Sequence, residues 1–537
     1  MENFTDQEKA ILKPFFTNLD KPVFVLVNLP EVVKGALFSR YSRSPKSLRR
    51  VLLEEFIQNP EMNFKEIASM DEKTIFEKFV ATKKAEEFYD RVLVGYGDDS
   101  VAELAGVHIA CEDVSQLLAA KALEDNRIGI SPLEKSTRYV WFDQKENGKY
   151  KYYRDPDIME SGFDNLYEES MDFLFDTYSE LVPPLSEFIQ SKNPKTEDVS
   201  ERAYQATIRA KVCDILRQLL PSCTLTNVGL FGNGRAFEYM LNKMYVSPLA
   251  EVRQLATSIQ EELDKVIPSF VKRAKTEHGK MMQEYLKNTE DAMWLFKIEG
   301  ATSREDIELV DYDQDAEEKV ISAILYPYSN LSMIELRKKV KEMAQDEKKK
   351  ILNEYAGRRK VRQHKIGRAF ENTFYTFDIL APLGAYKDLQ RHRMLTQQRQ
   401  LITTDYGFDI PKEILEAKLE VKYKKAMEQA SLAFNKVREK MPIQAQYLVP
   451  LGFKVRWYFK LNLREVCHLT ELRSSPQGHE YYRKIAQAIA LKVREVHPLL
   501  AEHATKFVDF KDYSLERLEA EKKLDEKIKK LQEKYKK

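Results

Sequence analysis

The chain has 537 residues and carries 86 Lys and Arg against 85 Asp and Glu, a net charge of +1 at pH 7. With 43% hydrophobic and 32% charged residues, this length predicts a globular protein of several domains, and the balanced charge argues against a general nucleic-acid or membrane-surface binder. No apolar run reaches the length of a membrane span, and the N-terminus lacks the pattern of a signal peptide, so we expect a cytoplasmic protein.

The four cysteines are Cys111, Cys213, Cys223 and Cys467. They form no CxxC pair and show no metal-ligand spacing. We therefore expect reduced, structural thiols and predict no metal site.

In the N-terminal half, two segments have clear local patterns. Apolar residues at helical spacing predict a core helix over 104–118, marked by Leu104, Val107, Cys111, Val114 and Leu118. His108 lies beside this stripe, where a histidine with internal partners is commoner than a ligand. Residues 141–154 are typical of a β-hairpin, with Asn147-Gly148 as its turn.

In the C-terminal half, residues 373–380 alternate in the manner of a strand, with Tyr375, Phe377 and Ile379 on one face. Pro382 then suits the start of a helix. Arg391-His392-Arg393 follows at the end of that helix. A solvated basic helix end is one interpretation of these three residues, because cations are favoured there. The other interpretation is a buried cluster that binds an anion.

The sequence also repeats itself. Leu220-Pro221 and Asn233-Gly234-Arg235 match Val449-Pro450 and Asn462-Leu463-Arg464 at a constant offset of 229 positions (450 − 221, 462 − 233 and 464 − 235). Glu251 and Glu480 keep the same offset. This register predicts two diverged copies of one domain, at residues 20–275 and 305–510, joined by a polar linker over 276–304. Residues 511–537 alternate Lys and Glu and predict a solvated, charged C-terminal helix.

Three motifs lie at matched places in the copies: Arg391-His392-Arg393, Glu134-Lys135-Ser136-Thr137-Arg138-Tyr139, and the segment from Asn462 to Arg473. Together they resemble the flavin-dependent (alternative) thymidylate synthase family. The resemblance covers most of the chain outside the linker and tail. It implies an α+β fold present as two diverged copies of the family's domain. It also implies conversion of dUMP to dTMP, with FAD as cofactor and with NADPH and methylenetetrahydrofolate as co-substrates.

The family's sites lie between subunits, and its motifs are divided between the two copies here. The resemblance assigns dUMP binding to Glu134, Ser136, Arg138, Arg217, Arg391 and Arg473, with Arg391 and Arg473 as the catalytic residues. It assigns FAD binding to Arg391, His392, Arg393, Asn462, Arg464, His468, Ser100 and Glu103. Copy one has Met244 in place of Arg473, and copy two has Gln446 in place of Arg217. Copy two also has Arg399, Leu401 and Thr403 in place of the Glu-Ser-Arg residues. One composite site per chain is therefore expected to be complete.

Several residues depart from the family pattern. Asp388 stands where the family has a glutamine near the nucleotide, Arg368 replaces a small hydroxyl residue near FAD, and Asp98 replaces a histidine. The spacing from Arg473 to Glu480 is one residue shorter than usual. These changes leave the identity of the nucleotide open.

The sequence thus predicts an FAD-dependent thymidylate synthase with one composite site, assembled as a homodimer of fused chains that mimics the family's tetramer. One alternative is a flavin- or nucleotide-binding relative with lost activity or with another pyrimidine nucleotide as substrate. A basic nucleic-acid-binding module is the second alternative, and the neutral charge and the lack of a basic patch interleaved with aromatic residues count against it. The expected partner is a small-molecule nucleotide, with no nucleic acid and no membrane.

Overall fold

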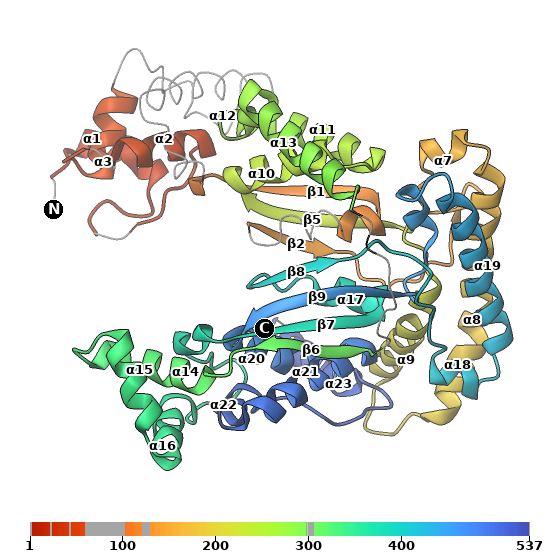
Figure 1. Cartoon of the computed structure of the whole chain (residues 1–537). Coiled ribbons are helices and arrows are strands. Elements are labelled where there is room, and N and C mark those ends of the chain that lie inside the picture. Colours follow the sequence, from red (N-terminus) through yellow and green to blue (C-terminus); the bar gives the residue numbers. More distant parts are fainter. Residues whose placement is uncertain are drawn as a thin grey trace. The chain divides into compact units, whose positions relative to one another are not determined.

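The computed structural model describes residues 3–21, 24–41, 44–58, 103–120, 129–296, 298 and 305–535. Contacts group the chain into two compact units. The first unit contains Met1–Glu112, Asp125–Glu134 and Asn227–Glu299, and the second contains Asp113–Glu124, Lys135–Thr226 and Gly300–Lys537. Figure 1 labels the elements of both. Among the described residues, no helix combines the length and apolar character that a membrane span requires.

The first unit contains most of a three-stranded sheet of order β1-β5-β2, in which β2 and β5 are antiparallel. Helices α10 to α13 follow β5 and pack on one another. The strands are β1 (Gly106–Ser115), β2 (Ile130–Glu134) and β5 (Leu225–Asn233). The helices are α1 (Asp6–Leu12), η1 (Lys13–Phe15), α2 (Glu31–Tyr41), α3 (Leu48–Val51), η2 (Leu52–Ile57), α10 (Gly234–Tyr245), α11 (Ala250–Asp264), α12 (Pro268–Val271), η6 (Lys272–Lys275) and α13 (Glu277–Met293).

The helix predicted over 104–118 is wrong, because residues 106–115 form strand β1 and only residues 116–120 are helical. Asp113 has a φ of 52°, so the alternation of the two strand faces is interrupted there. Cys111 and Val114 are consequently both buried although they are three positions apart. An extended segment thus acquired the spacing of a helix. His108 packs on the ring of Phe231, with ring centroids 4.5 Å apart, as expected of a structural histidine.

The second unit is built on a four-stranded sheet of order β6-β7-β9-β8. Helix α21 packs on β6 and β7, and α8 lies beside α19 (Figure 1). The strands are β3 (Lys145–Glu146), β4 (Lys149–Tyr150), β6 (Ile307–Tyr312), β7 (Phe374–Pro382), β8 (Leu395–Arg399) and β9 (Lys454–Asn462). The helices before β7 are α7 (Pro156–Glu160), α8 (Asp164–Lys192), α9 (Glu201–Leu216), η5 (Arg217–Leu219), α14 (Ala316–Leu325), η7 (Tyr326–Tyr328), α15 (Met333–Glu342), α16 (Gln345–Ala356) and η8 (Arg368–Asn372). Those after β7 are α17 (Leu383–Leu389), α18 (Lys412–Glu416), α19 (Glu420–Arg438), η9 (Gln444–Leu448), α20 (Leu463–Arg473), α21 (Glu480–Val496), α22 (Pro498–Ala504) and α23 (Leu518–Tyr535).

The local predictions for this unit are largely confirmed. Strand β7 buries Tyr375, Phe377 and Ile379 on one face, and α17 begins directly after Pro382. The hairpin is present as β3 and β4, and both turn residues have positive φ, 50° at Asn147 and 78° at Gly148, as a two-residue hairpin turn requires. The four cysteines are free and buried.

Two charged segments are better anchored than predicted. The C-terminal helix α23 is not simply solvated, because Arg202 at the start of α9 pairs with Glu521 and Asp525. Within the segment predicted as a linker, α13 packs on the first unit. The Gln283 side chain there donates to the Asn242 side chain over 3.0 Å and to the Ala274 carbonyl over 2.8 Å.

The two sheets share one strand order, because β7-β9-β8 repeats β1-β5-β2. Strands β5 and β9 begin and end 229 positions apart (454 − 225 and 462 − 233), and helices α10 and α20 begin at the same offset (463 − 234). This repetition agrees with two diverged copies of one α+β fold. The boundaries proposed for the copies, 20–275 and 305–510, stay a prediction, since residues 135–226 pack in the second unit with the C-terminal half.

A reciprocal set of backbone hydrogen bonds joins the matched segments inside the second unit. Pro221 and Pro450, matched by the offset, form an antiparallel bridge. Ser222 N donates to Val449 O while Leu451 N donates to Leu220 O, both over 2.9 Å. Adding 229 to the residue number in one copy and subtracting it in the other converts one bond into the other. Such reciprocal bonds are typical of repeats related by a two-fold axis.

Candidate functional site

Four of the predicted arginines lie in one cluster of the second unit. Arg138 follows β2, Arg217 begins η5, Arg391 follows α17 and Arg473 ends α20. Arg138 and Arg217 are buried, whereas Arg391 and Arg473 are half-buried. Tyr482 on α21 joins them, since the Arg138 and Arg473 guanidiniums both lie 5.6 Å from its ring centroid. Two motifs far apart in the sequence thus contribute to one site, with Arg391 and Arg473 at its accessible side.

Asp388 holds two of these arginines together. One carboxylate oxygen accepts from Arg217 Nη2 over 2.8 Å, and the other accepts from Arg391 Nη2 over 3.0 Å. Burial would raise the pKa of Asp388, but Arg217 and Arg391 outweigh it and hold that pKa well below its usual range. Arg217 Nη2 also donates to the backbone oxygen of Gly384 over 3.2 Å. The departure at Asp388 therefore supplies a charged bridge.

Arg138 is fixed by a carboxylate that the sequence analysis missed. Its Nε and Nη2 each donate over 2.5 Å to Asp214, and Nη1 donates to the Tyr482 hydroxyl over 3.0 Å. Ser136 orients this turn, because its hydroxyl accepts from Arg138 N over 3.2 Å. Burial opposes ionisation of Asp214, but Arg138 prevails and lowers its pKa. An acid within the apolar run Cys213-Asp214-Ile215-Leu216 was the available signal for a buried ion pair.

Arg473 differs from the other three arginines, because it has no carboxylate partner among the described residues. Its Nε donates to His392 Nε2 over 2.9 Å, and its Nη groups have no hydrogen-bond partner in the described part of the chain. Burial lowers the pKa of Arg473, with Arg391 and Arg138 acting in the same direction against Asp388 and Tyr482. The guanidinium is a cation with donors available to a ligand.

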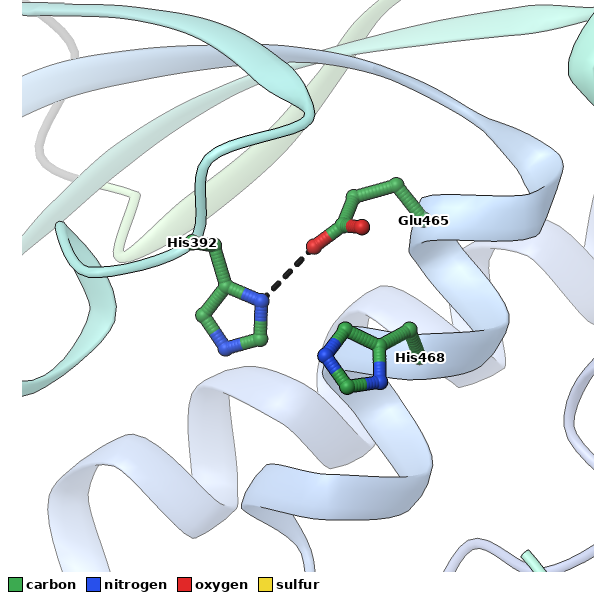
Figure 2. Close-up of side chains that lie close together, drawn as sticks. All are labelled: His392, Glu465 and His468. Carbon is green, nitrogen blue, oxygen red and sulfur yellow. Dashed lines mark hydrogen bonds and ion pairs between the residues drawn. The ribbon is translucent and has the colours of Figure 1, made fainter. Parts of the chain in front are cut away.

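His392 is buried, so the solvated-helix-end interpretation is wrong for this residue, although the neighbouring Arg393 is exposed. Figure 2 shows His392 facing Glu465 and His468, which both project from helix α20. The His392 Nδ1 lies 2.7 Å from Glu465 Oε1. Burial, reinforced by Arg473 and Arg391, lowers the pKa of His392 well below its ordinary value. Glu465 was missed from sequence, although it lies three positions before His468 on the same helix face.

The ring nitrogens and carboxylate of His392, Glu465 and His468 lie within 4.8 Å of one another, a grouping that could hold a metal ion. Their hydrogen bonds argue against one. Arg473 donates to Nε2 of His392, so the single proton of the neutral ring sits on Nδ1 and leaves that atom no lone pair for a metal. Lys365 Nζ, 3.2 Å from His468 Nδ1, adds a further positive charge. The grouping is better described as a hydrogen-bond network.

A cavity of about 260 Å³ opens beside this network. Three predicted FAD residues, Asn462, Arg464 and His468, line it together with Arg362 and Lys365. Glu371, Glu465 and Glu471 line the cavity as well, and its basic side chains are the donors that suit an anionic group such as a diphosphate.

Each of the three lining residues also has an internal partner. Asn462 caps α20 through its Oδ1, which accepts from Glu465 N over 2.9 Å. Arg464 donates to Glu371 over 2.6 Å, and Lys365 contacts His468. Arg368, which departs from the family pattern, is 84% exposed and pairs with the same Glu371.

The structure does not bring the remaining three predicted residues into this cluster. Ser100 is outside the described residues, as is Asp98. Glu103 and Glu134 belong to the first unit. Glu103 pairs with Arg235 over 2.9 Å on the surface, and Glu134 ends β2 opposite Val228. Their roles stay predictions.

The residues that replace the site residues at the matched positions of the other copy are used for structure. Gln446, in place of Arg217, accepts from Ile402 N over 3.1 Å and donates to Ile443 O over 3.0 Å. Met244, in place of Arg473, is buried in the core of the first unit. Arg399, Leu401 and Thr403 stand in place of the Glu-Ser-Arg residues. Arg399 Nη1 donates to Gln400 O over 3.0 Å, and the side chains of Leu401 and Thr403 are uncharged.

The structure thus shows a duplicated α+β protein with an arginine-rich cluster in its second unit. A sequence model described as thymidylate synthase complementing protein matches residues 50–269 and 308–499, once in each repeat. The chain therefore belongs to the thymidylate synthase complementing protein family. Its relatives include UPF0159 proteins of Chlamydia pneumoniae (46% identical over 97% of this chain and 98% of theirs), Chlamydia muridarum (44%, 97% and 98%) and Thermoplasma acidophilum (34%, 91% and 97%).

Proposed function

We propose that the chain is an FAD-dependent thymidylate synthase that methylates dUMP reductively at one composite site. The observation that carries this proposal is the meeting of Arg138 and Arg217 from the first repeat with Arg391 and Arg473 from the second. The matched positions Met244 and Gln446 cannot supply such a cluster, because neither side chain is charged.

The charge of the cluster suits a nucleoside monophosphate. The cluster contains four guanidinium groups and two buried carboxylates, Asp214 and Asp388, which pair with three of the four arginines, so two positive charges remain. A phosphate monoester carries a charge of about −1.5 to −2 near neutral pH. A dUMP phosphate therefore balances the site, whereas uncharged deoxyuridine leaves it unneutralised.

The side chains suggest separate roles. Arg217 and Arg391 present donors beside Asp388 and are assigned to the phosphate, with the hydroxyl of Ser136 as a further donor. Arg138, whose guanidinium is held by Asp214 and Tyr482, is assigned to frame the site by its charge. Arg473 is assigned to the pyrimidine, where its Nη groups would stabilise negative charge as C5 becomes nucleophilic. Glu134 is retained from the family resemblance as a further dUMP contact.

The cavity beside α20 is proposed to hold part of FAD. Arg464, His468 and Asn462 would bind it, with His392, Arg391 and Arg393 toward the reacting end and with Ser100 and Glu103 from the other repeat. Bound FAD supplies the redox and carbon-carrying chemistry, with NADPH as reductant and methylenetetrahydrofolate as carbon donor. The chain needs no nucleophile of its own, and burial raises the pKa of its cysteines Cys111, Cys213 and Cys467, which keeps them protonated.

A second candidate function is nucleotide or flavin binding without this turnover, or with a different pyrimidine nucleotide. Asp388 favours it, because this carboxylate already occupies donors of Arg217 and Arg391 that a phosphate would use. A ligand phosphate must then share those donors. The second candidate predicts flavin binding without dTMP formation.

Visible absorbance of the purified chain tests the proposal first. We expect about one FAD per chain, a change in the flavin bands on adding dUMP, no change with deoxyuridine, and dTMP formation once both co-substrates are added. Flavin binding and a dUMP response without dTMP would support the second candidate. No flavin after reconstitution would contradict the proposal and would leave, of the second candidate, only nucleotide binding without flavin. Mass measurement in solution would test the further proposal that two fused chains assemble as a homodimer.

A further inference from the structure

Glu465, His392 and Arg473 form a continuous chain of hydrogen bonds. The Glu465 carboxylate lies 2.7 Å from His392 Nδ1, and His392 Nε2 accepts from Arg473 Nε over 2.9 Å. Glu465 and His392 are buried, so water does not compete strongly for either bond. Figure 2 shows the first of these bonds, between α20 and the loop after α17.

The chain of bonds fixes the tautomer of the imidazole. An arginine Nε–H is only a donor, so Nε2 of His392 must be the unprotonated nitrogen. The ring proton then sits on Nδ1 and is donated to Glu465. A residue without an acceptor at position 465 would remove one of the two partners that select this tautomer and leave only the Arg473 donor, which a ring protonated at Nε2 would oppose.

We propose that Glu465 is a positioning residue that acts through His392 to hold the Arg473 guanidinium in the orientation in which its Nη groups face the nucleotide. The proposal rests on the proposed function for the role of Arg473, but the tautomer itself does not. Tyr482 supports the same orientation from α21, because the Arg473 guanidinium lies 5.6 Å from its ring centroid. Glu465 lies within the segment from Asn462 to Arg473, but the family resemblance assigned no role to it or to its bond with His392.

The positioning depends on pH, because burial raises the pKa of Glu465 to about 7. Above that pH the carboxylate is ionised and its bond to His392 is charge-assisted, and below it the bond weakens. The other charged or titratable groups that face Glu465 are Lys365, from the segment before η8, and Arg464, His468 and Arg473 on α20. Burial lowers the pKa of His468, so its ring is already neutral near pH 7. Titration of His468 therefore does not overlap with that of Glu465.

The tautomer is tested without substrate by nitrogen NMR of the full chain labelled at histidine. His392→Asn identifies the His392 signals. We expect the wild-type ring to carry its proton on Nδ1, the same tautomer in Glu465→Gln, and loss of that tautomer in Glu465→Leu. A wild-type ring protonated at Nε2, or an unchanged ring in Glu465→Leu, would overturn the proposal whether or not the chain makes dTMP.

The consequence for catalysis is tested by kcat/KM for dUMP across pH 6 to 8. The wild type should gain activity through an apparent pKa near 7. Glu465→Gln keeps an acceptor and should lose this pH dependence, whereas Glu465→Leu should lose about tenfold in kcat/KM, the size of one charge-assisted hydrogen bond. Glu413 is a buried carboxylate that pairs with Lys211, and Glu413→Gln serves as the control. This variant should keep the wild-type dependence of kcat/KM on pH.

The outcomes separate the two proposals. If the wild type makes dTMP and the Glu465 variants have the same kcat/KM and the same pH dependence, only the positioning role is contradicted. Absence of turnover in the wild type, with the Nδ1 tautomer lost in Glu465→Leu, would remove the proposed function and leave the control of His392 by Glu465 intact.

Discussion

Residues 217–224 and 446–453 occupy matched positions in the two repeats and have nearly the same backbone. Cys223 N donates to Tyr447 O, and the equivalent Gly452 N donates to Gln218 O. The first residues of the two segments, Arg217 and Gln446, have different roles. Arg217 reaches Asp388 in the arginine cluster, whereas Gln446 bonds to the backbone of Ile402 and Ile443. The duplication has kept these backbone hydrogen bonds reciprocal, whereas only the first repeat contributes an arginine at this position.

The strongest test of this comparison gives Arg217 the residue of the other repeat. Arg217→Gln leaves the buried Asp388 with Arg391 alone, so we expect a loss of about 3 kcal/mol in the free energy of unfolding and loss of dUMP binding. Urea unfolding and calorimetry measure both.

Gln446→Ala is the matched control for that substitution. It deprives the Ile402 amide of its acceptor, at a cost of about 1 to 2 kcal/mol, but should leave dUMP affinity unchanged. Equal losses of binding in the two variants would contradict the division of roles.

Arg473→Met makes the same exchange at the other end of the cluster, since Met244 is its counterpart. We expect kcat/KM to fall by about 100-fold or more, as for the loss of a donor to a developing anion. Stability should change little, because Arg473 has no carboxylate partner among the described residues. Met244→Leu serves as the control and should retain activity. Wild-type kcat/KM in Arg473→Met would remove Arg473 from catalysis.

The pH dependence of stability examines the carboxylate bridge. The folded-state pKa of Asp388 is lowered, so its contribution to stability is present above about pH 4 and is lost as the pH falls toward the folded-state value. Between pH 6 and pH 3 the free energy of unfolding of the wild type should fall by about 1 kcal/mol more than that of Asp388→Asn. Parallel losses in the two proteins would show that Asp388 is not ion-paired in solution.

An exposed ion pair between helix α9 of the first repeat and the C-terminal helix gives the smallest expected effect. Arg202, which is 44% exposed, binds the C-terminal helix through Glu521 and Asp525. Arg202→Ala should lower the free energy of unfolding by less than about 1 kcal/mol, because solvent screens such pairs. A loss as large as that of Arg217→Gln would mean that burial does not determine how much each ion pair contributes to stability.

Sequence patterns anticipated those parts of the fold that depend on local periodicity or on the repeat. The alternation in β7, the Asn147-Gly148 turn and the offset of 229 positions all appear in the structure. The segment at 104–118 failed because the positive φ of Asp113 gave a strand the spacing of a helix.

The site was anticipated only in part, for a related reason. The arginines could be recognised from their motifs, but their partners are distant in the chain. Asp214 lies 76 positions from Arg138, and Glu465 lies 73 positions from His392. No local pattern connects such pairs, and only the folded chain brings them together.

The number of dUMP molecules bound per chain tests the central claim most directly. Calorimetric titration of the FAD-loaded protein should give one dUMP per chain, with binding lost in Arg217→Gln and kept in Gln446→Ala. Two dUMP per chain, or binding that survives Arg217→Gln, would contradict a single composite site built from both repeats.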